Sequence, residues 1–207
     1  SVSSFRAHHK RGAVHWDMVR RIVLGILTGT FLGSVIAARM GTDLLKGFLV
    51  IFLYGVAVQL LMNREPKASR AVPGHVGMFG VGNGIGVISA MVGIGGGTLS
   101  VPFMVWCNLS LRPAIGTSAA IGFPIALAGA IGYIFNGLGN VNLPEYSLGY
   151  VYLPGMLGVA CTSMLTAPLG VRLAHRLPMN NLKKVFAILL LVVATRMLIG
   201  SIQNLMG

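Results

Sequence analysis

The stretch that decides the fold reads Gly93-Ile94-Gly95-Gly96-Gly97-Thr98-Leu99-Ser100-Val101-Pro102, and it lies inside an otherwise apolar region. Three consecutive glycines interrupt a helix, and every unpaired backbone group is costly in the hydrocarbon of a bilayer. A broken helix is tolerated there only where protein covers it or where it lines a wet cavity. Secondary transporters build their substrate sites from such helices near the bilayer midplane. The stretch therefore points to transport.

The composition is that of a membrane protein. Hydrophobic residues make up 55% of the 207 residues and charged residues only 10%, and the mean hydropathy is +0.80. A helix needs about 20 apolar residues to cross a hydrocarbon core of roughly 30 Å. Runs of about that length cover 22–38, 44–62, 114–135, 148–170 and 184–203, and the glycine-rich region 76–106 is a sixth. We expect an all-α, polytopic integral membrane protein.

The formal net charge of +12 does not indicate a nucleic-acid partner. The 16 Lys and Arg residues lie mainly between the apolar runs, where the positive-inside rule places them. Cys107 and Cys161 lie in or beside apolar segments and are interpreted as free thiols. His8 and His9 have no cysteine or carboxylate nearby to complete a metal site, so we expect no metal or cofactor. No His or Asp lies at membrane depth to activate Ser118, which argues against an enzyme.

The charges also predict a topology. Basic loops at 6–21, 63–75 and 171–184 are assigned to the cytoplasm, whereas loop 136–147 carries Glu145 and no Lys or Arg. Both ends of the glycine-rich region then lie on the cytoplasmic side. We therefore predict a re-entrant hairpin with Gly95–Gly97 at its tip and a second half-helix beginning at Thr98. At 1.5 Å per residue, residues 98–107 would reach about 15 Å, which is half of the hydrocarbon depth.

An internal repeat is consistent with this architecture. The run from Leu32 to Met40 aligns with Leu169 to Leu177, and Leu44–Phe48 aligns with Leu182–Phe186. An odd number of crossings in each copy would make the repeats inverted, as in many secondary transporters. We accordingly divide the chain into the end of a first repeat (1–62), a cytoplasmic linker (63–75) and a second repeat (76–207). Chance similarity between apolar helices is the alternative.

The residues near the glycines suggest an anion as the ligand. All four acidic residues, Asp17, Asp43, Glu65 and Glu145, lie in expected loops or at the ends of spans, which is unusual for a cation carrier. A half-helix that starts after Gly97 offers free N–H groups and a positive dipole end to an anion. We expect Gly96 to approach the ligand closely and to adopt a positive φ.

Hydroxyl donors on Thr98, Ser100, Thr117 and Ser118 would add to this site. In the alternative interpretation the glycines permit close helix packing and the hydroxyls bond to helix carbonyls. The small residues Gly82, Gly86 and Ser89 share one helix face, and we interpret them as packing residues.

Arg196 is the one charge that lies deep in an apolar run. About twelve residues separate it from Lys184, which places it roughly 18 Å from the cytoplasmic end of its span. A charge at that depth needs a partner or a wet cavity. We predict that Arg196 contributes to the anion pathway, with snorkelling toward the outer face as the alternative.

The run Gly93-Ile94-Gly95-Gly96-Gly97, followed by Val101-Pro102 and by Ala114-Ile115-Gly116-Thr117-Ser118, resembles the sulfite exporter TauE/SafE family. The runs Leu169–Ala174 and Leu182–Ala187 are similar to the close of that family's second half. The resemblance covers about 76–203, and 1–62 resembles the end of the first half. It implies a multi-pass transporter of the bacterial inner membrane that exports sulfite, sulfonates or related small anions. Because the family has two glycine-rich halves, we expect an N-terminally truncated member.

We therefore predict a secondary transporter that exports a small anion such as sulfite or an organosulfonate. Its partners would be this anion and the lipid bilayer. We expect no nucleic-acid partner, and the sequence is compatible with a homo-oligomer. The alternative is a non-transporting membrane scaffold or assembly subunit. The predicted substrate-binding residues are Gly95, Gly96, Gly97, Thr98, Ser100, Gly116, Thr117, Ser118 and Arg196.

Overall fold

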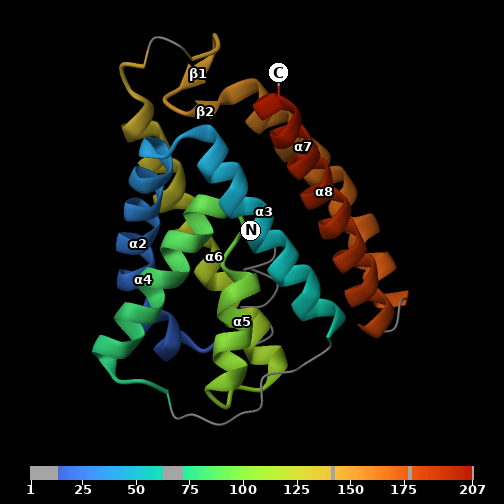
Figure 1. The fold of residues 1–207 in the computed structure, drawn as a ribbon. Coiled ribbons are helices and arrows are strands. Elements are labelled where there is room, and N and C mark those ends of the chain that lie inside the picture. The colour runs from blue at the N-terminus through green and yellow to red at the C-terminus, as the bar shows by residue number, and fades with distance from the viewer. Residues whose placement is uncertain (1–13, 63–71, 141–142, 177–178, 207) are drawn as a thin grey trace. The chain divides into compact units, whose positions relative to one another are not determined.

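The computed structural model describes residues 14–62, 72–140, 143–176 and 179–206, which form helices and one short β-ribbon (Figure 1). The basic segments at 6–13 and 63–71 lie outside these residues. The elements are α2 (Trp16–Arg39), α3 (Thr42–Leu61), α4 (His75–Val92), α5 (Gly97–Trp106), α6 (Leu111–Gly137), β1 (Ser147–Leu148), β2 (Val151–Tyr152), α7 (Leu153–Arg176) and α8 (Met179–Met206).

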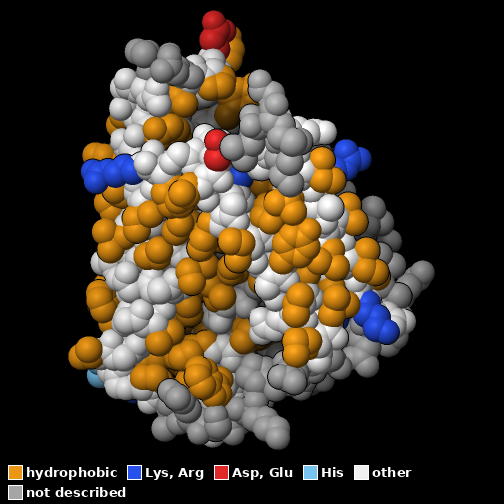
Figure 2. Space-filling view, in the orientation of Figure 1, with side chains coloured by type: hydrophobic (Ala, Val, Ile, Leu, Met, Phe, Trp, Pro, Cys, Tyr) orange, Lys and Arg blue, Asp and Glu red, His pale blue; other side chains and the backbone are white. Residues whose placement is uncertain are grey.

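The helices confirm the expected membrane class. Within the described residues, five segments are long and apolar enough to span a bilayer: Trp16–Arg39, Thr42–Leu61, His75–Val92, Pro113–Gly137 and Lys183–Ser201. Hydrophobic side chains cover much of the face seen in Figure 2, and few charged side chains interrupt them. Ile51 and Val159, for example, are 74% and 67% exposed, which is costly in water and favourable against lipid. The chain is a multi-pass helical membrane protein.

One expected helix begins later than the sequence suggested. We expected an apolar helix from residue 148, but β1 and β2 form an antiparallel ribbon in which Ser147 pairs with Tyr152. Gly149, with φ +55°, permits the tight turn between these strands. Pro154 then fits the first turn of α7, where no backbone N–H is needed. The described apolar part of α7 is Leu153–Thr166.

The contacts between residues divide the chain into two compact units. Unit 1 contains Ser1–Arg39 and Glu65–Gly137, and unit 2 contains Met40–Arg64 and Leu138–Gly207. The neighbouring helices α2 and α3 thus belong to different units. This grouping is by packing, whereas the repeat-based division proposed above is by sequence, and that division stays a prediction.

In unit 1, α2 and α4 pack closely through glycines. Gly25 and Gly29 face the backbone of Phe79 and Asn83 on α4, in the same order along both helices, so the two helices run parallel. On the other side, a Cβ atom on Gly82 would lie 2.6 Å from the carbonyl oxygen of Ile22. Small residues at such spacing let membrane helices approach closely. The packing role predicted for Gly82 is confirmed.

The rest of unit 1 packs around α6, which contacts α2, α4 and α5. The core of unit 1 is formed by buried apolar side chains of α2, α4, α5 and α6, among them Ile22, Ile26, Met78, Met104, Ile121 and Ile125. Close packing of this kind fixes the relative positions of the helices that surround the break between α4 and α5.

In unit 2, α3 packs against α8. The hydroxyl groups of Tyr54 and Thr195 are hydrogen-bonded across this contact at 2.8 Å. The helices α3 and α8 contain the two segments, 44–48 and 182–186, that the internal repeat aligns. Their pairing is compatible with the repeat.

Candidate functional site

The glycine-rich stretch breaks the helix, as expected, in unit 1. Helix α4 ends at Val92, and Gly93 closes it in the left-handed conformation, with φ +70° and its N–H donating to the Ser89 carbonyl at 2.9 Å. Helix α5 begins at Gly97, one residue before the predicted start at Thr98. The prediction of a positive φ at Gly96 was wrong, because its φ is −50° and Gly93 already provides the left-handed residue at the end of α4.

The two helices on either side of the break run in opposite directions. In Figure 1 the ends of α4 and α5 that are distant from the break both lie toward the lower part of the view. Both helices contact α6, which runs past the break as one continuous helix. This backbone path is that of a hairpin with the broken segment at its tip. Its depth in a membrane remains a prediction.

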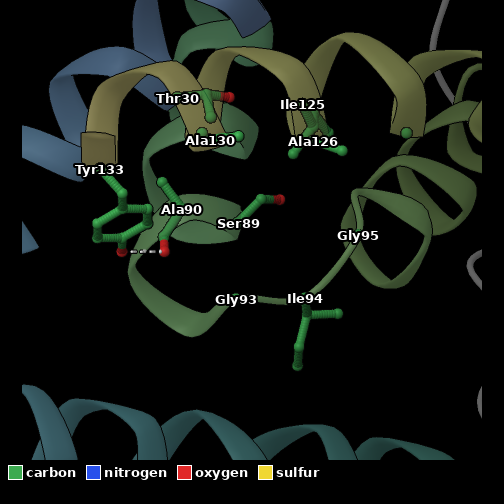
Figure 3. Close-up of a pocket in the computed structure, with 12 residues that line it drawn as sticks. Thr30, Ser89, Ala90, Gly93, Ile94, Gly95, Ile125, Ala126, Ala130 and Tyr133 are labelled. Carbon is green, nitrogen blue, oxygen red and sulfur yellow. Dashed lines mark hydrogen bonds between the residues drawn. The ribbon is translucent and has the colours of Figure 1, made fainter. Parts of the chain in front are cut away.

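A pocket of about 220 Å³ lies at this break (Figure 3). Helix α2 contributes one lining residue, α4 two, the broken segment three and α6 the remainder. Most of the lining is glycine or small apolar side chain, and three residues carry hydroxyl groups. The lining residues are Thr30, Ser89, Ala90, Gly93, Ile94, Gly95, Gly122, Ile125, Ala126, Gly129, Ala130 and Tyr133.

The three hydroxyl groups of the pocket differ in their partners. The Tyr133 hydroxyl donates to the Ala90 carbonyl at 2.8 Å and so joins α6 to the last turn of α4. Ser89 is 4% exposed, and Figure 3 shows its hydroxyl directed into the space beside the broken segment. Thr30 is fully buried, and among the described residues its Oγ1 has no hydrogen-bond partner. The sequence does not predict Thr30 or Tyr133 at this site, because no motif marks them, and it indicates only a packing role for Ser89.

Of the predicted glycines, only Gly95 lines the pocket. A Cβ atom on Gly95 would meet no other atom within 4 Å, so a larger side chain has room there. Gly96 is buried, and a Cβ atom on it would meet the end of the Ile125 side chain. Gly97 begins α5, and a Cβ atom on it would lie 3.4 Å from the Ser118 hydroxyl.

The predicted hydroxyl residues on α5 and α6 lie outside the pocket. Ser100 donates to Ser118 at 2.8 Å, and both side chains are buried between the helices. The Thr117 hydroxyl accepts the backbone N–H of His15 at 3.0 Å, which ties the start of α2 to α6. Gly116 is buried on α6 and Thr98 is half-buried in the first turn of α5. These bonds join neighbouring parts of the protein, whereas the alternative stated above expected bonds to helix carbonyls. A ligand role for these residues remains a prediction.

Arg196 belongs to unit 2, where it is an exposed residue of α8. Its neighbour Thr195 makes the contact with Tyr54. Arg196 is not among the described residues that line the pocket, and its role in an anion pathway remains a prediction.

The electrostatic character of the pocket comes from backbone and hydroxyl dipoles. All twelve described lining residues are uncharged. Among the described residues, the amide groups of residues 94–98 donate to no backbone carbonyl. The first turn of α5 adds the positive end of a helix dipole next to these amides. Such a concentration of free N–H donors is suited to an anion.

Comparison with known proteins identifies the family. The sequence profile of the sulfite exporter TauE/SafE family matches residues 1–197. A relative named "Probable membrane transporter protein" from Haemophilus influenzae is 33% identical over 198 residues, which are 95% of this chain and 75% of the relative. The chain belongs to the sulfite exporter TauE/SafE family.

More distant relatives carry similar names. A "Probable membrane transporter protein" from Methanocaldococcus jannaschii is 23% identical over 96% of this chain and 74% of its own length. The MamO protein of Paramagnetospirillum magneticum, also named a probable membrane transporter, is 25% identical over 91% of this chain and 35% of its own length. No solved structure is significantly similar to the chain.

The family assignment confirms the resemblance seen in the sequence, including that of the N-terminal part. The protein is a membrane transporter rather than an enzyme. These findings therefore do not favour the alternative of a non-transporting scaffold. A multi-pass location is also established, and it is consistent with the bacterial inner membrane.

Proposed function

We propose that this transporter exports a small anion, of the sulfite or organosulfonate type, and that the anion binds in the pocket at the break between α4 and α5. The observation that carries the proposal is the pocket itself, because its lining combines hydroxyl groups with Ile94 and Gly95, whose backbone amides donate to no backbone carbonyl of the described residues. Broken helices that present their ends to a cavity are the usual way in which secondary transporters hold ions without lipid contact.

The size of the pocket also supports a small substrate. Its volume of about 220 Å³ is below the roughly 300–1,000 Å³ that is typical for pockets of drug-sized ligands. The apolar part of the lining, formed by Ile94, Ala126 and their neighbours, could cover the organic group of a sulfonate. Neutral N–H and O–H donors could hold the oxyanion at the other end.

Within this proposal the predicted residues have different roles. Gly95 would supply a backbone donor to the anion, Gly97 and Thr98 would add the dipole of the first turn of α5, and Gly96 would allow the chain to pass close to Ile125. Ser100, Thr117 and Ser118 would hold α5 and α2 against α6. Gly116, next to Thr117, would allow close packing on α6. Arg196 would attract the anion along its path.

The proposal is tested by anion flux into proteoliposomes. Sulfite, methanesulfonate, sulfate and acetate are supplied separately to the wild type and to Gly95→Leu. The leucine adds a bulky side chain at a residue that lines the pocket, where a Cβ atom meets no other atom, so we expect saturable flux of sulfite or methanesulfonate in the wild type that falls about tenfold or more in the variant.

Gly84→Leu is the matched control. Gly84 also lies on α4 and a Cβ atom on it meets nothing within 4 Å, but it is exposed and does not line the pocket. We expect wild-type flux in this variant. Saturable flux that is equal in the wild type and in Gly95→Leu would place the anion elsewhere, and the absence of flux for all four anions would reject the substrate class.

A further inference from the structure

We infer that the hydroxyl group of Thr30 donates a hydrogen bond to an oxygen atom of the transported anion, which makes α2 part of the substrate site. This inference rests on the proposed function, since it names a contact within the same pocket. It assigns a substrate contact to a helix outside the glycine-rich region.

The first observation is that the Thr30 hydroxyl lacks a partner. Its side chain is 0% exposed, and no described residue accepts or donates a hydrogen bond at Oγ1. A buried hydroxyl without a partner is costly, so such groups are rare unless something else satisfies them. Because Oγ1 itself has almost no accessible surface, a ligand in the adjoining pocket would do so after a rotation of the Thr30 side chain.

The second observation is that Thr30 departs from the usual behaviour of hydroxyl residues in helices. A threonine within a helix commonly bonds to a carbonyl three or four residues earlier. Other hydroxyl residues of this protein do so, namely Thr28, Ser34, Thr162 and Thr166. The Thr30 hydroxyl makes no such bond. Its Oγ1 lies against Gly86 of α4.

The third observation is the place that the packing gives to Thr30. A Cβ atom on Gly86 of α4 would lie 2.9 Å from Oγ1, and a Cβ atom on Gly129 of α6 would lie 3.5 Å from Cγ2. Two glycines thus make room for Thr30 where α2, α4 and α6 meet. In Figure 3 its hydroxyl points to the same side as that of Ser89, beside Ile125 and Ala126.

The chemistry of the group fits an oxyanion. A threonine hydroxyl is a neutral donor, and a hydrogen bond from it to a charged oxygen is stronger than one to a neutral acceptor. The amides beside Gly95 and the Thr30 hydroxyl come from different elements around the same pocket. They can therefore bind different oxygen atoms of one sulfite or sulfonate group.

The experiment uses Thr30→Val, which keeps the shape of the side chain and removes the hydroxyl. The half-saturation concentration for flux is measured with sulfite and with methanesulfonate in proteoliposomes. Thermal unfolding of the purified protein in detergent is measured with and without each anion. We expect a roughly 10-fold to 100-fold higher half-saturation concentration and a smaller anion-induced rise in melting temperature. Without anion, the variant should be as stable as the wild type or more stable, because an unpaired buried hydroxyl has been removed.

Two variants complete the test. Thr30→Ser retains the hydroxyl and should keep most of the affinity. Thr28→Val removes a hydroxyl that donates to the Leu24 and Gly25 carbonyls and accepts from the Asn83 side-chain amide. Because Thr28 does not line the pocket, this variant should leave the half-saturation concentration unchanged. An unchanged half-saturation concentration in Thr30→Val, or a loss of stability without anion, would overturn the inference while leaving the proposed function intact. Absence of saturable flux in the wild type would instead reject the proposed function.

Discussion

At the scale of single residues, the hydroxyl groups of unit 1 fall into two classes. Ser100, Ser118 and Thr117 are bonded to other parts of the protein, whereas Thr30 and Ser89 lie in the wall of the pocket. A hydroxyl that is already bonded between helices stabilises their packing. An unpaired one at a pocket is available to a ligand.

The Ser100–Ser118 contact gives a prediction about stability. Replacing either serine with alanine should lower the free energy of unfolding by about 0.6–1.7 kcal/mol, as for other hydrogen bonds between membrane helices. The double variant should lose little more than either single variant, because both remove the same bond. The measurement is denaturation in detergent, with flux assayed in parallel. A large fall in anion affinity with unchanged stability would instead assign these serines to the substrate.

Arg196 gives a second prediction at this scale. It is an exposed residue within the candidate span Lys183–Ser201, where a charge costs at least about 2.5–3.5 kcal/mol in lipid. If it attracts the anion, Arg196→Gln should raise the half-saturation concentration for sulfite several-fold, and Arg196→Lys should retain part of the effect. Equal kinetics in the wild type and the glutamine variant would limit the arginine to a role in topology.

The sequence could predict the site only in part, and the reason is visible in these residues. The glycine run marks the break in the helix and therefore predicts Gly95 as a residue of the site. It does not say which neighbouring hydroxyl groups face the pocket, since that depends on rotamers and on the packing of α2 and α6. Thr30 lies on a helix more than 50 residues before the break, and its place depends on Gly86 and Gly129.

At the scale of elements, the break between α4 and α5 is the feature that the sequence predicted best. Three adjacent glycines and Pro102 limit where a helix can continue, so the start of α5 was predicted to within one residue. The start of α7 was missed because hydropathy alone does not distinguish the ribbon at Ser147–Tyr152 from a helix. A turn at Gly149 decides the structure there.

The hairpin gives a prediction about topology. Val76 and Ser110 lie near the two ends of the α4–α5 hairpin, and both are exposed. If the hairpin is re-entrant, single cysteines at these positions should react with a membrane-impermeant thiol reagent from the same side of the membrane. The background is a Cys161→Ser variant, because Cys161 is exposed. Labelling from opposite sides would contradict the re-entrant arrangement.

At the scale of the whole molecule, the family assignment establishes a membrane transporter, and the chain consists of two compact units. The glycine-rich hairpin, its supporting helices α2 and α6 and the pocket all belong to unit 1. The central claim is that the anion occupies the pocket beside Gly95.

Substrate protection of a cysteine at this position tests the claim most directly. Gly95→Cys is made in the Cys161→Ser background, and the rate of its reaction with a small thiol reagent is measured as sulfite or methanesulfonate is added. Gly84→Cys on the exposed side of α4 is the control. If the anion occupies the pocket, it should slow labelling at position 95 over the same concentration range in which its flux saturates. It should leave labelling at position 84 unaffected. Saturable flux of that anion with unchanged labelling at position 95 would contradict this claim.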